Sequence, residues 1–258
     1  MLLKADALMK AAVLMNTLVR WLLAGIMAVS LSIAVALPAT AGTFSISPLR
    51  IELDRKQNIG VLTIHNDEDA PLLIQAQIVA WSQQNNEEIY SPSKDLLVTP
   101  PVIQLAPKSD QIVRVALRHV ELNDSELHYR LILNEVPPEK RDNFNGLSVA
   151  LRMSIPVFIK PGTVSPEMKW TTTWSGDGSM IVEAYNAGTA HLQVTDFELQ
   201  FGDTEKLRVN PSRYVLPGSR ITWTVKPPAT IDRNAAITIH GYSDQGEFRV
   251  AASNADVH

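Results

Sequence analysis

The feature that most constrains the fold is an alternating run from Gly146 to Phe158, which reads G-L-S-V-A-L-R-M-S-I-P-V-F. Small or polar residues separate its apolar residues, which are Leu147, Val149, Leu151, Met153 and Ile155. Alternation with a period of two predicts a β-strand with one apolar face. The alternation covers the nine residues from Leu147 to Ile155. At about 3.3 Å per residue a strand of this length would extend roughly 30 Å, which is longer than most strands.

Two interpretations of this run remain open at this point. It can be an edge strand that offers its apolar side chains to another protein, because an unpaired edge is a template for a second chain. It can equally be a central strand whose apolar face lies in the protein's own core. Pro156 favours an edge or a strand end, because proline has no N–H to donate to a neighbouring strand.

The N-terminus has the features of a signal peptide. Lys10 and Arg20 precede an apolar stretch over residues 21–37, and the small residues Ala39 and Ala41 follow in an A-x-A cleavage pattern. We therefore expect residues 1–41 to be a signal peptide and Gly42 to be the first mature residue. Initiation at Met15 would give a leader of ordinary length. The alternative is an uncleaved membrane anchor, since the apolar stretch is almost long enough to span a bilayer.

Removal of residues 1–41 takes away three cations and one anion, so the formal charge of the mature chain is 20 minus 26, or −6. No basic stripe is present in the sequence, which argues against a nucleic-acid partner. The chain has no cysteine, so disulfides and thiolate chemistry are excluded. After the leader we expect no membrane insertion.

The mature chain alternates short strand patterns with turn signals throughout. The first part contains about seven expected strands spaced as in an immunoglobulin-like sandwich, at residues 44–54, 59–65, 72–81, 103–105, 111–117, 127–133 and 146–158. A Pro/Gly stretch at Lys160-Pro161-Gly162 suggests a boundary. We expect a second, smaller β domain beyond it, with strands at residues 169–174, 180–186, 192–201, 220–225, 236–242 and 247–251. The expected division is therefore 42–161 and 162–258.

No catalytic constellation stands out in the sequence. There is no G-x-S-x-G elbow, no H-E-x-x-H motif and no glycine-rich phosphate loop. The six histidines are scattered, without metal-ligand spacing to one another. We therefore expect no catalytic residue, no metal and no cofactor, and we predict that the chain is not an enzyme.

Several blocks together resemble one family, the PapD-like periplasmic chaperones of the chaperone–usher pilus pathway. The blocks are S-P-L-R-I-E-L at residues 47–53, I-H-N at 64–66, T-P-P-V-I-Q-L-A-P-K-S-D-Q-I-V-R-V at 99–115 and Y-R-L-I-L-N-E-V-P-P at 129–138, together with the alternating run. The I-P-V-F ending of that run looks like the archaic or alternative branch of the family. The second domain resembles the family only weakly.

The resemblance implies two immunoglobulin-like sandwiches in a boomerang arrangement, located in the periplasm. It implies that the alternating run is a donor strand, whose apolar side chains complete the fold of a pilus subunit. Donor-strand complementation is a known mode of peptide recognition. The implied partners are pilus or fimbrial subunits and an outer-membrane usher, and no cofactor is implied.

The resemblance also implies site residues. Two cations of the family hold the terminal carboxylate of the subunit; the first matches Arg50, whereas the position of the second is occupied by Pro156. Arg152, on the same strand face as Pro156, is a candidate replacement. An interdomain ion-pair network of the family falls on Glu126, Lys160 and Asp244.

Two other classes of protein remain as alternatives. An exported structural pilus or adhesin subunit would also be all-β, but it would carry its donor segment at the N-terminus and form a single sandwich. A secreted hydrolase on a β scaffold is disfavoured by the missing catalytic motifs.

Overall fold

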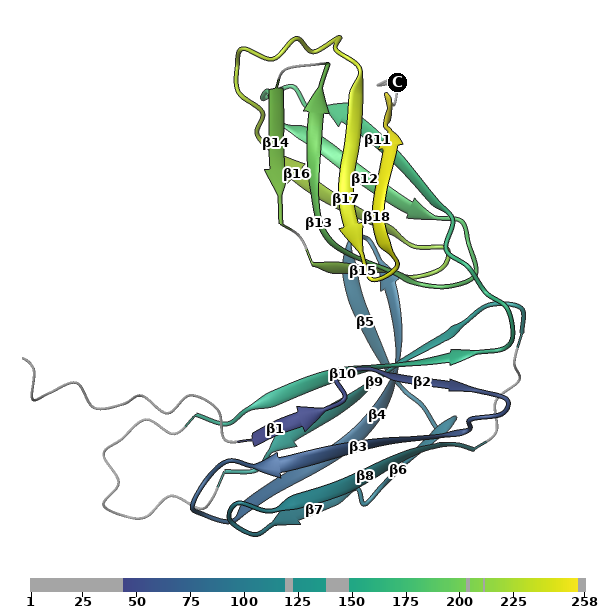
Figure 1. Cartoon of the computed structure of the whole chain (residues 1–258), viewed down its shortest axis with the longest axis vertical. Helices are drawn as coiled ribbons and strands as arrows, with labels where there is room; N and C mark the ends of the chain where they lie inside the picture. The colour runs from purple at the N-terminus through teal and green to yellow at the C-terminus, as the bar shows by residue number, and fades with distance from the viewer. Residues whose placement is uncertain (1–43, 119–122, 138–148, 203–204, 211, 255–258) are drawn as a thin grey trace, which may run out of the picture. The chain divides into compact units, whose positions relative to one another are not determined.

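The computed structural model describes residues 44–118, 123–137, 149–202, 205–210 and 212–254. Within these ranges the chain forms β-strands and no helix (Figure 1). The expected all-β class is confirmed. Because none of the described segments is a long apolar helix, none of them meets the criteria for a membrane-spanning helix.

The first ten strands form two sheets. One sheet has the order β1-β3-β8-β6, and the other has the order β2-β10-β9-β4-β5, with β7 also pairing with β4. The strands are β1 (Phe44–Ser47), β2 (Ile51–Asp54), β3 (Ile59–Asn66), β4 (Leu72–Gln84), β5 (Glu87–Pro92), β6 (Leu96–Thr99), β7 (Val102–Leu105), β8 (Asp110–Leu117), β9 (Leu127–Glu135) and β10 (Arg152–Lys160).

The remaining strands form two further sheets, with the orders β16-β12-β11-β19 and β14-β13-β17-β18, and β15 pairs with β13. They are β11 (Met168–Trp174), β12 (Met180–Asn186), β13 (Leu192–Phe201), β14 (Glu205–Val209), β15 (Arg213–Val215), β16 (Arg220–Val225), β17 (Ile237–Ser243), β18 (Gly246–Ala251) and β19 (Ser253–Asn254). No sheet mixes strands from before and after the segment that joins β10 to β11.

Each pair of sheets encloses its own apolar core. Alternate residues of the strands point inward, as in β3, where Leu62 and Ile64 are buried between exposed or half-exposed neighbours. Gly60 lies on the same inward face. A side chain there would collide with Ile51 of β2, so a glycine at this position lets the two strands pack closely. The result is two sandwiches, each with the layered architecture of an immunoglobulin-like domain.

In each sandwich a buried asparagine ends one strand and donates two hydrogen bonds to backbone carbonyl oxygens. Asn66 ends β3, and its side-chain amide donates to the carbonyl oxygens of Ala70 (2.9 Å) and Ala106 (3.0 Å). Asn186 ends β12 in the same way, donating to Ala190 (2.7 Å) and Val215 (2.9 Å). Both asparagines are fully buried. A buried amide that meets backbone acceptors at the end of a strand fixes the path of the following turn.

The strand at the alternating run is shorter than the sequence predicts. β10 begins at Arg152, whereas residues 149–151 are not in a strand and residues 146–148 lie outside the described part of the chain. The reason is that the partner strand β9 ends at Glu135. The next N–H, that of Val136, donates to the carbonyl of Leu73, and the following Pro137 has no N–H to offer.

The two edges of β10 differ. One edge pairs with β9 from Arg152 to Ile159. The other pairs with β2 only from Val157 to Lys160. Among the described residues, therefore, the edge of β10 from Arg152 to Pro156 has no partner strand. β10 is thus a central strand from Val157 onward and an edge strand before Val157.

Candidate functional site

Arg50 lies immediately before β2, where it meets two carboxylates. Its Nη1 lies 2.7 Å from Oδ2 of Asp244, and its Nε lies 3.2 Å from Oε1 of Glu52. About a third of the side chain, 36 %, remains exposed. Burial alone would lower the pKa of Arg50, but Asp244 and Glu52 outweigh it, and the pKa is raised. The predicted cation is therefore paired within the protein itself.

Lys160, the last residue of β10, pairs with the second carboxylate of this group. Its Nζ lies 2.6 Å from Oε2 of Glu52. The parallel pairing of β2 with β10 explains the contact, because it sets Glu52 opposite Phe158, two residues before Lys160. Glu52 thus joins Arg50 to Lys160 across the sheet.

His191 joins the other end of the group to Glu126. Its Nδ1 lies 2.6 Å from Oε1 of Glu126, its backbone N–H donates to the same oxygen at 3.3 Å, and its Nε2 lies 3.5 Å from Oδ2 of Asp244. The imidazole stacks on the ring of Phe158, with centroids 3.6 Å apart. The Glu126 side chain has no exposed surface, so its charge depends on these contacts.

The pKa shifts of Glu126, Asp244 and His191 all favour the charged form of the side chain. Burial would raise the pKa of Glu126, but its contacts with His128 and His191 lower it to about 2. Burial would likewise raise the pKa of Asp244, whereas His191, the N–H of Gln193 and Arg50 lower it to about 2. Burial would lower the pKa of His191, yet the two carboxylates raise it above 6.5. The two carboxylates therefore favour the protonated form of His191.

The contacts link into one continuous chain of charges, from Lys160 through Glu52, Arg50, Asp244 and His191 to Glu126. The three residues that the family resemblance assigns to an ion-pair network, Glu126, Lys160 and Asp244, all belong to this series of contacts. Among the described residues they do not pair with one another directly. Glu52 and His191, which connect them, were missed. Glu52 looked like an ordinary strand carboxylate, and His191 was one of six scattered histidines.

A second arginine, Arg130 of β9, lies beside Pro156, the position at which the family resemblance implies a cation. In the antiparallel pairing of β9 with β10, Arg130 stands directly opposite Pro156. Its guanidinium lies over the ring of Trp81, 3.7 Å from the centroid, and its Nη2 lies 3.5 Å from Oε2 of Glu88. Arg152, the replacement considered from the sequence, is exposed and stands opposite Asn134 instead. Sequence reasoning missed Arg130 although it lies within the Y-R-L block.

The expected donor residues fall into three groups in the structure. Leu147 lies outside the described residues. Val149 is 65 % exposed, and Leu151 and Met153 are half-buried against the first core. Ile155 is 3 % exposed and belongs to that core. The expectation that Ile155 offers its side chain to another protein is therefore corrected: although Ile155 lies on the edge stretch of β10, its side chain fills the core of the protein's own first sandwich.

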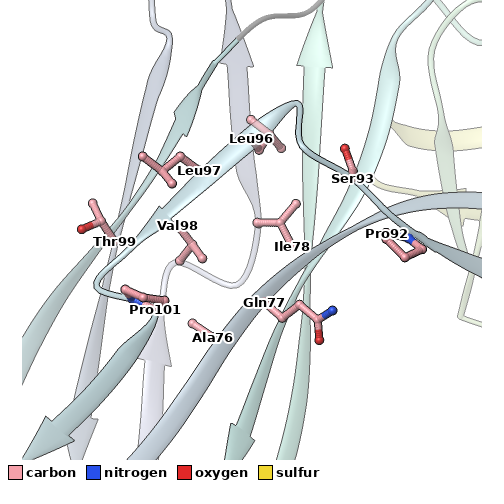
Figure 2. Close-up of a pocket in the computed structure, with 10 residues that line it drawn as sticks. All are labelled: Ala76, Gln77, Ile78, Pro92, Ser93, Leu96, Leu97, Val98, Thr99 and Pro101. Carbon is pink, nitrogen blue, oxygen red and sulfur yellow. The ribbon is translucent and has the colours of Figure 1, made fainter.

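An apolar hollow of about 430 Å³ lies on another part of the same sandwich. It forms at Ala76–Ile78, because β7 pairs with β4 only up to Gln75 and β5 begins pairing at Val79. Figure 2 shows Ile78 close to Leu96 and Val98 of β6. None of the side chains that line the hollow is titratable. Nor do the described histidines and carboxylates gather into a group that could hold a metal ion.

Comparison with known proteins finds similarity in sequence and in fold to one class. Residues 43–165 match the family described as "Pili and flagellar-assembly chaperone, PapD N-terminal domain". The fimbrial chaperone YhcA of Escherichia coli K12, itself described as uncharacterized, is 29 % identical over 131 residues, covering 50 % of this chain and 55 % of the relative. The chaperone protein CssC of E. coli is 26 % identical over 110 residues, covering 39 % and 44 %. The matched part thus spans about half the length of these curated relatives.

Among solved structures, the fold resembles a chain from the CsuC–CsuE chaperone–tip adhesion subunit pre-assembly complex of the archaic chaperone–usher Csu pili of Acinetobacter baumannii. The TM-score is 0.65 at 17 % identity, with 83 % of this chain and all of that chain covered. At this identity the likeness establishes the fold of two immunoglobulin-like sandwiches. The family match over residues 43–165 and this fold agree on pilus-assembly chaperones as the class of protein that the chain resembles. Residues 43–165 thus match the PapD N-terminal domain family, and the chain resembles pilus-assembly chaperones in fold.

Proposed function

We propose that this protein is a periplasmic chaperone that binds and caps pilus subunits by donor-strand complementation and delivers them to an outer-membrane usher. In this proposal residues 1–41 are the signal peptide. Residues 42–161 form the subunit-binding domain, and residues 162–258 form the second domain. The I-P-V-F ending of the alternating run and the likeness to an archaic Csu complex support assignment to the archaic branch.

The single observation that carries the proposal is the unpartnered edge of β10. Among the residues that the structure describes, Arg152–Pro156 pair with β9 on one side only, so backbone groups on their other side can pair with another strand. Just before this edge, Val149 exposes an apolar side chain and Leu151 is half-buried, and within the edge Met153 is also half-buried. A free edge with adjacent apolar side chains is a hazard unless another chain covers it. A pilus subunit whose sandwich lacks one strand could cover this edge, because it would gain both the missing strand and the apolar side chains that complete its core.

The experiment is co-expression of the full chain with the exported β subunits encoded beside its gene. We expect a stable one-to-one complex that protects the subunit from degradation, since burial of apolar surface contributes about 25 cal/mol per Å². Size-exclusion chromatography and intact mass measure the complex. If every such subunit accumulates and purifies equally well without this chain, the proposed function is wrong.

A separate prediction concerns export. The protein recovered from periplasmic extract should begin at Gly42, because the A-x-A pattern ends at Ala41. Intact mass and N-terminal sequencing measure this directly. Recovery of the chain in the membrane fraction with residues 21–37 retained would show an anchor instead of a cleaved signal.

A further inference from the structure

The hairpin formed by β4 and β5 contacts the second sandwich (β11–β19) at its tip. Its loop consists of Asn85 and Asn86, because Gln84 of β4 pairs with Glu87 of β5. Both asparagines have positive φ angles, 52° and 66°. A two-residue loop of this kind is a type I′ turn, and asparagine tolerates the conformation better than most residues with a side chain. Within residues 82–88, Gln83 and Asn86 are half-buried and the others are exposed.

The side-chain amide of Asn86 takes the place of a neighbouring strand beside β16. Its Nδ2 donates to the carbonyl oxygen of Thr222 (3.2 Å), and its Oδ1 accepts from the backbone N–H of Thr222 (2.9 Å). On its other side β16 pairs with β12, where Thr222 stands opposite Glu183. Arg213 of β15 donates to Oδ1 and to the backbone carbonyl oxygen of Asn86, at 2.9 and 2.8 Å. Asn86 therefore holds the edge of β16 and the start of β15 together.

Gln83 bonds to the second sandwich in the same way. Its Nε2 donates to the carbonyl oxygen of Tyr214 (2.9 Å), and its Oε1 accepts from the N–H of Leu216 (3.0 Å). A primary amide carries both a donor and an acceptor, so it can satisfy a C=O and an N–H that a strand edge leaves open. The two amides of the hairpin thus bond to backbone groups, whose positions are fixed by the second sandwich itself.

The second sandwich also lies beside the strand edge that is proposed to bind the subunit. The edge of β10 without a partner strand among the described residues ends at Pro156. Two residues later, the ring of Phe158 stacks on the imidazole of His191, with centroids 3.6 Å apart. A strand laid along this edge therefore meets the second sandwich at its end. The orientation of the second sandwich relative to β10 determines the space that is open to a subunit there.

We propose that the tip of the β4–β5 hairpin, residues Gln83–Asn86, is a strut that holds the two sandwiches in the orientation in which β10 captures a pilus subunit. Gln83 and Asn86 are its positioning residues. The part of this inference that concerns the subunit rests on the proposed function. The strut is an attachment separate from the series of charges between Lys160 and Glu126, and its amides do not titrate.

The test measures the distance between the two sandwiches in the full mature chain. The chain has no cysteine, so cysteines introduced at Lys94 and Arg249, exposed positions of the first and second sandwich, take one spin label each. Wild type should give one narrow distance distribution by pulsed electron paramagnetic resonance. Asn86→Gly permits the positive φ but removes the amide, so the distribution should broaden. If about one molecule in ten then keeps the competent orientation, affinity for the subunit encoded beside the gene falls about tenfold.

Two further variants separate the amide from the turn. Asn85→Gly is the matched control, because among the described residues the Asn85 side chain makes no hydrogen bond to the second sandwich. It should change neither the distance distribution nor the affinity. Asn86→Asp keeps the oxygen that accepts from Arg213 and from the N–H of Thr222, so it should recover much of the narrow distribution and of the binding.

Each other outcome has a definite meaning. If Asn86→Gly keeps the wild-type distance distribution, the hairpin is not a strut. If the distribution broadens and subunit affinity is unchanged, the orientation does not serve capture and the proposal is wrong. If wild type binds no subunit, the proposed function fails, and the distance measurement, which needs no subunit, still decides whether the hairpin is a strut. Should thermal melts show that Asn86→Gly does not fold, Gln83→Ala removes the other amide, and the same readings apply.

Discussion

Val149→Asp is expected to abolish capture of the subunit while leaving the chaperone folded. Val149 is 65 % exposed and lies outside any strand of the described structure, so a carboxylate there stays solvated in the free protein. In the proposed complex the same position enters an apolar groove. An unpaired carboxylate in such a groove is strongly unfavourable, and we expect affinity to fall by about 100-fold or more.

The matched control is Ala150→Asp at the next position. Ala150 is also exposed, and it has the opposite parity in the alternating run. The introduced charge is therefore the same, but a strand would turn it away from the groove. Affinity should change by less than about threefold. Thermal melts of both variants should match wild type, and equal losses of binding at the two positions would show that parity does not define a binding face.

Leu151 is a poorer choice for this comparison, and the structure gives the reason. Its side chain packs partly against the first core, so Leu151→Asp would destabilise the chaperone as well as any complex. The alternating pattern alone could not separate the exposed valine from the half-buried leucine. That distinction depends on where β9 ends, and hence on how far its partner β10 extends.

Strong alternation between clear turns was enough to predict several strands. β12 and β13 have the predicted limits because apolar residues alternate along both strands and glycine-containing turns bound them. β12 lies between turns that contain Gly178 and Gly188, and β13 ends just before Gly202. β5 was missed because its sequence, E-E-I-Y-S-P, is exposed along its whole length. It forms by pairing with β4 at the sheet edge, so the interaction that creates the strand is not local.

The site was predictable only where the family resemblance supplied positions. Arg50 and Asp244 are 194 residues apart, and no pattern in either segment indicates that they form an ion pair. His191 gave no signal because a single histidine has no spacing to interpret. Arg130 could not be recognised as opposite Pro156 until the register of β9 against β10 was known. Pairing across strands, rather than residue type, defines these sites.

The second large effect is expected for Glu126→Gln, which should lower the free energy of unfolding by about 3 kcal/mol near pH 5.5. The substitution keeps the shape of the side chain but removes the charge that faces His191 at 2.6 Å. His191 then remains buried with Asp244 at 3.5 Å as its nearest anion. The Glu87→Gln control, at an exposed position of β5, should change stability by less than about 0.5 kcal/mol.

The effect of this substitution should depend on pH with a predictable sign. The pKa of Glu126 is lowered to about 2, so its contribution is present above its ordinary value of 4.5 and is lost as pH falls toward 2. The pKa of His191 is raised, so the contribution of its cation is full below 6.5 and is lost as pH rises through the raised value. The difference between wild type and Glu126→Gln should therefore be largest between about pH 4.5 and 6.5 and shrink on both sides.

Urea unfolding of wild type, Glu126→Gln, His191→Gln and the double variant across this pH range provides the measurement. If the two side chains act as a charged pair, Glu126→Gln should destabilise the His191→Gln protein by at least about 1 kcal/mol less than it destabilises wild type. His128 lies 3.4 Å from the same Glu126 oxygen, and Arg50 faces Asp244 beyond His191. Both residues are present in all four proteins, so the double-variant comparison separates the interaction of Glu126 with His191 from theirs. An equal cost in both backgrounds, or a cost that is constant from pH 3 to pH 9, would mean that Glu126 stabilises the protein through packing and not through the charge of His191.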